Sequence, residues 1–134
     1  GGGLALYCMG RSDAFAAGAI YYQSMFPDPA ELAGITGKLQ CHYGTEDRST
    51  PAEEINRFRA EIDRLDIKNE VHYYEGMGHS FLNPRQEASS NQEQAAVLSL
   101  QRTFAFFHEE LSAEPPRVGA SNARVTKPST SETT

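Results

Sequence analysis

Apolar residues along the chain follow two patterns, and together these predict alternating strands and helices. Short apolar runs at 17–22, 38–44 and 69–76 have the length of buried strands. Elsewhere, apolar residues recur every three or four positions, which is typical of helices that bury one face. The predicted order is helix, strand, strand, helix, strand, helix.

The predicted helices are recognised by their ends and by their apolar faces. The first precedes Gly10, which is well placed to end it. The second begins at Thr50, directly before Pro51. Its expected buried face consists of Ile55, Phe58, Ile62 and Leu65. The third covers 92–111. Its expected buried stripe consists of Val97, Leu100, Phe104, Phe107 and Leu111.

The segments between the strands are long enough for parallel pairing, so the fold class is α/β. About three parallel strands flanked by helices are expected, an arrangement that forms the C-terminal half of a larger open sheet. The 17–22 strand would then be an apolar edge through which the chain self-associates. The folded domain is expected to cover 1–111, and the Ser-, Thr- and Pro-rich stretch 112–134 to be a disordered tail.

The charge balance narrows the range of partners. The 134 residues include 12 Lys or Arg against 18 Asp or Glu, a net charge of −6. Nucleic acid and anionic membranes attract clusters of basic residues that this chain lacks, and no apolar run is long enough to span a bilayer. A small-molecule ligand is therefore expected. Two cysteines without a disulfide framework favour the reducing cytoplasm.

Two residues with catalytic chemistry follow consecutive predicted strands. Asp47 comes just after the 38–44 strand, and His79 just after the 69–76 strand. Because parallel strands bring their carboxyl ends to one edge, both side chains are expected at the same rim. A carboxylate that accepts the Nδ1 proton of a histidine orients the ring and stabilises imidazolium, as in a triad of nucleophile, histidine and acid. Glu46 is the neighbouring alternative for the acid.

The residues around His79 are small. Gly76, Gly78 and Ser80 would leave room for a substrate beside the imidazole. Taken alone, a histidine in a polar loop is equally well explained as a surface residue. Its position after Asp47, in triad order, favours the catalytic interpretation.

Several motifs in chain order resemble the second half of the dienelactone hydrolase family of α/β-hydrolases. They are GGGLAL, AAGAIYYQ, LQCHYGTEDRSTP, VHYYEGMGHSFLNP and RTFAFFHEEL, and they cover residues 1 to about 111. The resemblance implies hydrolysis of an ester or lactone without a cofactor, with His79 as the proton shuttle and Asp47 as its orienting acid. That family carries its nucleophile in a G-x-C-x-G-G elbow. Gly1 and Gly2 would close this elbow, so a Cys or Ser two positions before Gly1 would be the nucleophile, and the 134 residues alone are expected to be inactive.

Neither cysteine of the chain is a good candidate for the nucleophile. Cys8 has Leu6 two positions before it, where an elbow needs glycine, and about eight residues separate Cys8 from the next strand. A parallel crossover with its helix needs roughly a dozen, so Cys8 is expected to be a small buried residue of the first helix. Cys41, in the middle of a strand, is expected in the core.

Neither a metal site nor a phosphate-binding loop is indicated. Cys41, His42, His72 and His108 have none of the spacings of zinc sites. The opening glycines follow no strand and precede no Gly-Lys-Ser/Thr motif.

One departure from the family bears on the substrate. Dienelactone hydrolases that accept a carboxylated lactone place an Arg four positions after the catalytic histidine, where this chain has Asn83. Arg85 lies beyond Pro84, a poor position from which to replace it. A neutral ester is therefore as compatible with the sequence as a dienelactone. Two other functions remain: a non-catalytic α/β-hydrolase-like module that binds a ligand or partner and, less favoured, a flavodoxin-like binding domain.

Overall fold

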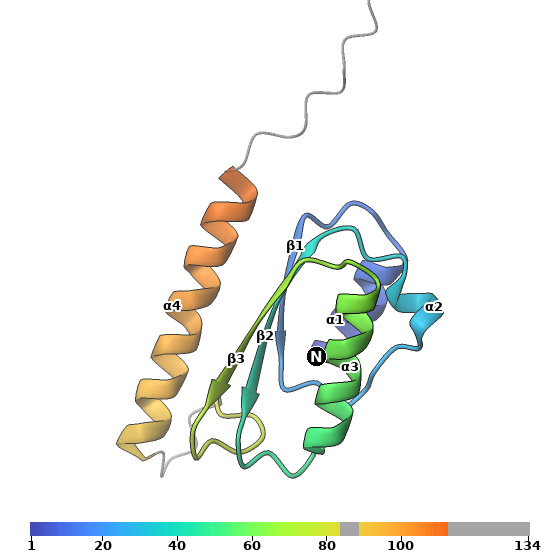
Figure 1. Ribbon diagram of the computed structural model, residues 1–134. Coiled ribbons are helices and arrows are strands. Elements are labelled where there is room, and N and C mark those ends of the chain that lie inside the picture. The colour runs from blue at the N-terminus through green and yellow to red at the C-terminus, as the bar shows by residue number, and fades with distance from the viewer. Residues whose placement is uncertain (84–88, 113–134) are drawn as a thin grey trace, which may run out of the picture.

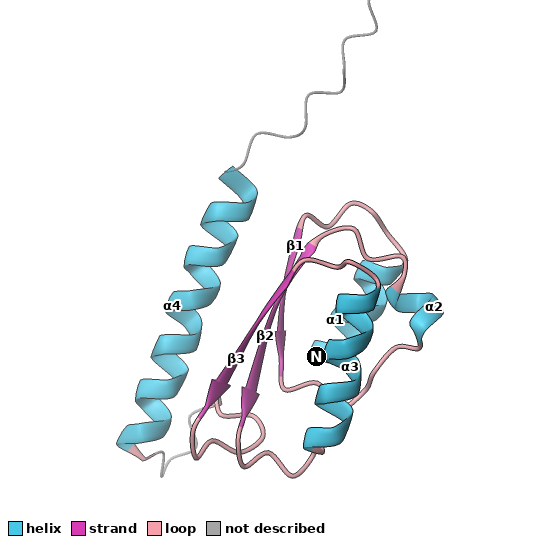
Figure 2. Cartoon of the chain, viewed as in Figure 1, coloured by secondary structure: helices cyan, strands magenta, loops and turns pink. Residues whose placement is uncertain are grey.

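The fold is a three-layer sandwich, and the computed structural model describes residues 1–83 and 89–112 of it. Its sheet has the strand order β1 (Ala17–Tyr21), β2 (Lys38–Gly44), β3 (Asn69–Tyr74), and both pairings are parallel. One face of the sheet is covered by α1 (Gly2–Gly10), α2 (Pro29–Leu32) and α3 (Ala52–Arg64) (Figure 1). The opposite face carries α4 (Ser90–Ser112), as Figure 2 shows. The predicted α/β class and parallel pairing are confirmed.

The central strand β2 has two different faces because side chains alternate along a strand. Leu39, Cys41 and Tyr43 are fully buried on the face that packs against α1 and α3. Gln40 and His42 are buried on the other face, beneath α4. The main apolar core thus lies on one side of the sheet, and the opposite side holds buried polar groups.

Three local features differ from the prediction. β1 ends one residue early because the chain turns at Tyr22, whose φ is 34°. The helix α2 lies in a stretch expected to be a loop; Asp28 caps its first turn by accepting from the Glu31 N–H. Thr50 does not cap α3, because its hydroxyl instead donates to the Gln23 carbonyl, 2.8 Å away.

Helix α3 buries the face that its sequence predicts. Ile55, Phe58 and Ile62 are buried, and Leu65 is partly buried against the same cluster just beyond the end of the helix. Phe58 packs against Phe26, with 5.5 Å between the ring centroids. Apolar burial of this kind is the main stabilising contribution to an amphipathic surface helix.

Helix α4 contradicts the predicted buried stripe. Val97, Phe104 and Leu111 are exposed by 54%, 68% and 65%, and Leu100 is also exposed. The buried residues are Ser99, Thr103 and Phe106. This apolar stripe of α4 (Val97, Leu100, Phe104, Phe107 and Leu111) therefore faces largely away from the sheet.

The physical reason for the orientation of α4 is the polar side of β2. The Gln40 amide donates to the Arg102 carbonyl at 3.2 Å, and the Thr103 hydroxyl donates to Gln40 Oε1 at 3.2 Å. Buried polar groups cost free energy unless they are hydrogen-bonded, so the helix presents the face that can bond to them. Periodicity identifies residues that share a face but not which face meets the sheet.

His42 is the centre of this polar layer. Its Nδ1 lies 2.8 Å from the Tyr74 hydroxyl and its Nε2 lies 2.8 Å from Gln40 Oε1. Its ring stacks on that of Tyr21 with 4.2 Å between centroids. Burial, with smaller effects from His72 and Arg102, lowers the pKa of His42 from 6.5 to about 3. The imidazole is therefore neutral in the folded chain.

The sequence-predicted tail 112–134 falls outside the described residues apart from Ser112, the last residue of α4. None of the helices described is long and apolar enough to cross a membrane.

We expect the free energy of unfolding to depend on pH through His42. The folded pKa lies below the unfolded value, so the unfolded chain binds the extra proton. The stabilisation is present above pH 6.5 and declines toward pH 3, by up to about 1.4 kcal/mol per pH unit. Urea midpoints measured at pH 7 and pH 5 should differ accordingly.

The His42→Gln variant should lose most of this difference between pH 7 and pH 5. The matched control is His108→Gln, because His108 is exposed on α4 and its substitution should leave the difference in place. A His42→Gln variant with an undiminished pH dependence would contradict the assignment.

Candidate active site

The loops that follow β2 and β3 are tied together by their backbones. The Glu46 N–H donates to the Met77 carbonyl at 2.9 Å, and the Gly76 N–H donates to Thr45 Oγ1 at 2.8 Å. A Cβ at Gly44 would lie 2.1 Å from the Met77 carbonyl oxygen, so only glycine permits this close approach. The two strand tips are therefore held at a fixed separation.

This arrangement brings Asp47 and His79 into direct contact. His79 Nδ1 lies 2.9 Å from Asp47 Oδ2, within hydrogen-bonding distance. The other carboxylate oxygen, Oδ1, accepts from the Ser49 N–H at 2.8 Å. The Asp47 side chain is 1% exposed and that of His79 is 37% exposed. The carboxylate is thus shielded and doubly bonded, whereas part of the imidazole remains accessible to a substrate.

Glu46, the alternative acid, is placed differently. Its side chain is exposed, and its contribution to the site is the backbone bond to Met77. The backbone forms a tight turn at its neighbour Asp47, whose N–H donates to the Gly44 carbonyl at 3.3 Å.

A hollow of about 230 Å³ adjoins the imidazole. It is lined by residues 76–81 together with Ser89 and Gln92. A Cβ built at Gly78 would meet no atom within 4 Å, so the space beside His79 is open there. The small residues of this loop therefore do leave room beside the ring.

Tyr22, at the tip of β1, is a site residue that the sequence analysis did not identify. Its ring lies edge-on to that of His79, with 5.1 Å between centroids and 63° between planes. It also contacts Phe81, at 5.5 Å and 72°. Its only sequence signal is the tyrosine pair that ends the first apolar run, because the contact depends on a turn that no motif marks.

The start of α1 lies at this same edge of the sheet. A Cβ at Gly2 would lie 2.6 Å from the Tyr21 carbonyl oxygen and 3.1 Å from Gln23 Cβ. Tyr21 and Gln23 flank Tyr22, which contacts His79. The chain therefore enters α1 from the edge that holds the Asp47 and His79 pair.

Cys8 is exposed, which corrects the prediction that it is buried. It lies six residues after Gly2, and at 1.5 Å per residue this is about 9 Å further along α1, away from the edge that holds Asp47 and His79. The buried positions of α1 are instead Gly3, Leu6 and Met9. Its place on the helix argues against a role as the nucleophile of His79.

The other candidate ligands and nucleophiles have structural positions. Cys41 is fully buried in β2, and burial raises the pKa of its thiol to about 12. His42 and His72 lie within β2 and β3, and His108 lies on α4. Within residues 1–83 and 89–112, no three His, Cys, Asp or Glu side chains group as metal ligands.

Two positions bear on whether a substrate carboxylate could be bound, Asn83 and Arg85, and the structure describes the first of them. Asn83 is exposed, and its N–H donates to the Ser80 carbonyl at 2.9 Å. Arg85 lies outside the described residues.

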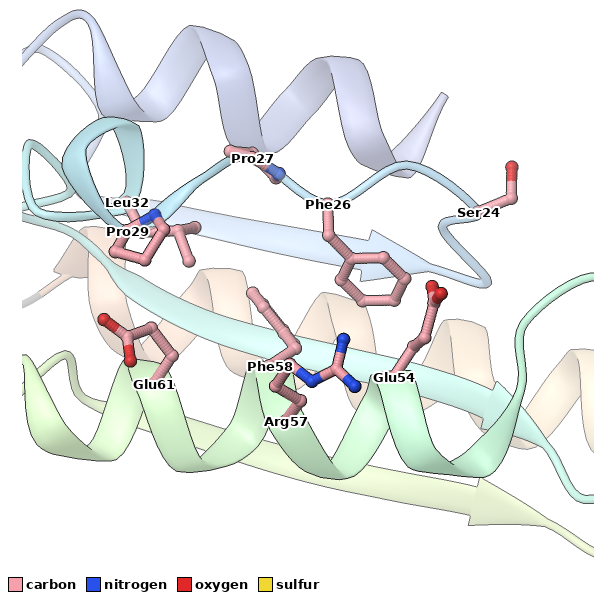
Figure 3. A pocket seen from close by; sticks show the side chains of 9 residues that line it. All are labelled: Ser24, Phe26, Pro27, Pro29, Leu32, Glu54, Arg57, Phe58 and Glu61. Carbon is pink, nitrogen blue, oxygen red and sulfur yellow. The ribbon is translucent and has the colours of Figure 1, made fainter.

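A separate cleft of about 400 Å³ lies between the 24–32 segment and α3 (Figure 3). Its walls are mixed: Phe26 and Phe58 lie side by side, and the charged residues Glu54, Arg57 and Glu61 lie along α3. Neither Asp47 nor His79 lines it.

Comparison with known proteins identifies the family. The model of the dienelactone hydrolase family matches residues 1–111. The carboxymethylenebutenolidase of Rhodococcus opacus is 34% identical over 95 residues, which make up 70% of this chain and 35% of that protein.

Solved structures show the same fold. A dienelactone hydrolase-like promiscuous phosphotriesterase from metagenomic libraries has a TM-score of 0.74 at 19% identity, over 82% of this chain and 48% of that chain. Esterase 2 of Thermogutta terrifontis, phosphorylated by paraoxon, has a TM-score of 0.54 at 19% identity, over 70% and 40%. The chain spans about a third of the curated relative and less than half of these two structures. With a match that runs from Gly1 to Leu111, the chain belongs to the dienelactone hydrolase family.

Proposed function

We propose that this chain supplies the acid and the histidine of a hydrolase that cleaves a carboxylic ester or lactone. The observation that carries the proposal is the 2.9 Å contact between His79 Nδ1 and Asp47 Oδ2 at the tips of adjacent strands. Membership of the dienelactone hydrolase family supports it, as does the open space beside the ring. Asp47 orients the imidazole, and His79 transfers the proton.

The nucleophile of this proposal is a Cys or Ser two positions before Gly1. His79 Nε2 takes its proton while the thiol sulfur or hydroxyl oxygen attacks the substrate carbonyl carbon, and His79 then gives that proton to the leaving alkoxide. Water, deprotonated by His79, next attacks the acyl-enzyme, and the acid is released as His79 returns that proton to the thiolate or alkoxide of the nucleophile. Asp47 stays ionised throughout and stabilises the imidazolium. The oxyanion is held by backbone N–H groups that also precede Gly1.

The position of α1 supports this placement of the nucleophile. Gly2 packs against the Tyr21 carbonyl at the catalytic edge, so a residue just before Gly1 lies within the same region as His79. The proposal covers a neutral ester as well as a dienelactone, and Asn83 cannot pair with a substrate carboxylate as an arginine does.

The first test is to read the coding sequence upstream of Gly1 and to express the domain with its upstream residues. We expect a Cys or Ser at the nucleophile position and turnover of a simple aryl ester. His79→Ala and Asp47→Asn should each lower kcat by roughly 10³-fold or more, since removal of a triad member has effects of this order. The 134-residue chain assayed alone should show no turnover.

Glu46→Gln is the matched control, because it removes a neighbouring carboxylate that does not contact His79. It should leave kcat unchanged. Loss of activity in Glu46→Gln but not in Asp47→Asn would contradict the assignment of the acid, and turnover by the 134 residues that disappears in Cys8→Ala would contradict that of the nucleophile.

We further propose that the 134-residue chain self-associates through the open edge of β1 and the apolar stripe of α4. Within the described part of the chain, β1 pairs with β2 alone. Unpaired edges and exposed apolar stripes both favour association.

Light scattering coupled to size-exclusion chromatography should give a mass above that of one chain, and Phe104→Glu should lower that mass. The control Gln101→Glu adds the same charge at an exposed polar position of α4 and should leave the mass unchanged; a wild-type monomer would refute the proposal.

A second candidate function is a non-catalytic module that binds a small ligand. The cleft of about 400 Å³ between the 24–32 segment and α3 favours it, since ligand sites commonly have this size and combine apolar walls with a few polar groups. The residue encoded two positions before Gly1 separates the candidates: Ala or Gly there supports the binding module, and Cys or Ser supports the hydrolase.

A further inference from the structure

Three non-glycine residues of the described chain have left-handed backbone: Tyr22, Asp66 and Ser80, with φ of 34°, 57° and 62°. Asp66 follows the end of α3, where this conformation is common. The other two lie at the proposed active site, because Ser80 follows His79 and Tyr22 contacts its ring. Strained backbone that clusters in this way indicates a geometry held for function.

The strained turn at Tyr22 is held from both sides. The Tyr22 N–H donates to the His42 carbonyl at 2.9 Å, which continues the pairing of β1 with β2. The next residue, Gln23, is buried: its amide donates to the Tyr43 hydroxyl at 2.7 Å, and its carbonyl accepts from Thr50 Oγ1 at 2.8 Å. These contacts compel the chain to turn sharply at Tyr22.

The consequence of the turn is that the Tyr22 ring packs beside the imidazole. It contacts Phe81, which is 2% exposed, and lies edge-on to His79. Edge-to-face packing between rings is attractive and restricts their rotation. Burial raises the pKa of Tyr22, so the ring next to His79 is uncharged over the physiological range.

We propose that Tyr22 is a positioning residue: its ring braces the imidazole of His79 so that Nδ1 stays directed at Asp47 Oδ2 and Nε2 stays free for proton transfer. The assignment rests on the proposed function, in which His79 is the proton shuttle. Asp47 alone constrains one ring nitrogen, and the ring can still rotate about that contact. The packed tyrosine removes this freedom.

The test is nitrogen-15 NMR of the histidines in the 134-residue chain above the pKa of free histidine, where the spectra report the Nδ1–H and Nε2–H tautomers. Wild type and Tyr22→Phe should show His79 mainly as the Nδ1–H form. Tyr22→Gly removes the ring and also relieves the left-handed strain. We expect it to lower the ratio of Nδ1–H to Nε2–H forms by about threefold or more, the effect of weakening one hydrogen bond.

Stability separates positioning from a merely structural role. Glycine tolerates positive φ, so the urea midpoint of Tyr22→Gly should equal or exceed that of Tyr22→Ala, while both lose the tautomer preference. Should the glycine variant fail to fold, Tyr22→Asn makes the same comparison, because asparagine also tolerates positive φ and carries no ring. Rescue by Tyr22→Phe is required, because the proposal assigns the effect to the ring.

The outcomes distinguish this proposal from the one on which it rests. A wild-type tautomer ratio in Tyr22→Gly, or a lost preference in Tyr22→Phe, overturns the role of Tyr22 and leaves the Asp47 and His79 pair standing. An Asp47→Asn variant in which the His79 tautomer ratio is unchanged overturns the pair itself, and the proposed hydrolase and the positioning role fail together.

Discussion

The parallel register of β2 between its two neighbours is the constraint on which the remaining structure depends. Because all three strands run the same way, their carboxyl ends reach one edge, and the loops that follow them meet there. Gly44 lets the β2 tip approach the Met77 carbonyl closely enough for the two backbones to bond. The contact between Asp47 and His79 is a consequence of that spacing, and the start of α1 reaches the same edge by packing on Tyr21.

The two faces of β2 explain why the two sides of the sheet are built differently. On one side, Leu39, Cys41 and Tyr43 join a continuous apolar core with α1 and α3. On the other, Gln40 and His42 require hydrogen-bond partners, and α4 provides them with Thr103 and a backbone carbonyl. The cost of leaving buried polar groups unpaired outweighs the gain from burying the apolar stripe of α4, so that stripe faces away from the sheet.

The edge that holds Asp47 and His79 combines a shielded carboxylate with a strained backbone. The Asp47 side chain is 1% exposed, and its second carboxylate oxygen accepts from the Ser49 N–H, so the carboxylate is held in place beside the imidazole. Of the two left-handed residues here, Ser80 follows His79 in the chain and Tyr22 contacts its ring, and tertiary contacts hold Tyr22 in place. Backbone strain of this kind costs stability locally and persists only where the surrounding contacts hold it.

Local pattern in the sequence was sufficient for the three strands, the three longer helices, the parallel pairing, the buried face of α3 and the family. These features follow from periodicity, connection length and motif order, which can be read directly along the chain. Tertiary structure alone decided which face of α4 meets the sheet, that Cys8 is exposed, that Thr50 bonds to Gln23, and that Tyr22 turns toward His79. Each of these outcomes is a competition between partners far apart in the chain, and such a competition is settled by the hydrogen bonds and space that the assembled fold provides.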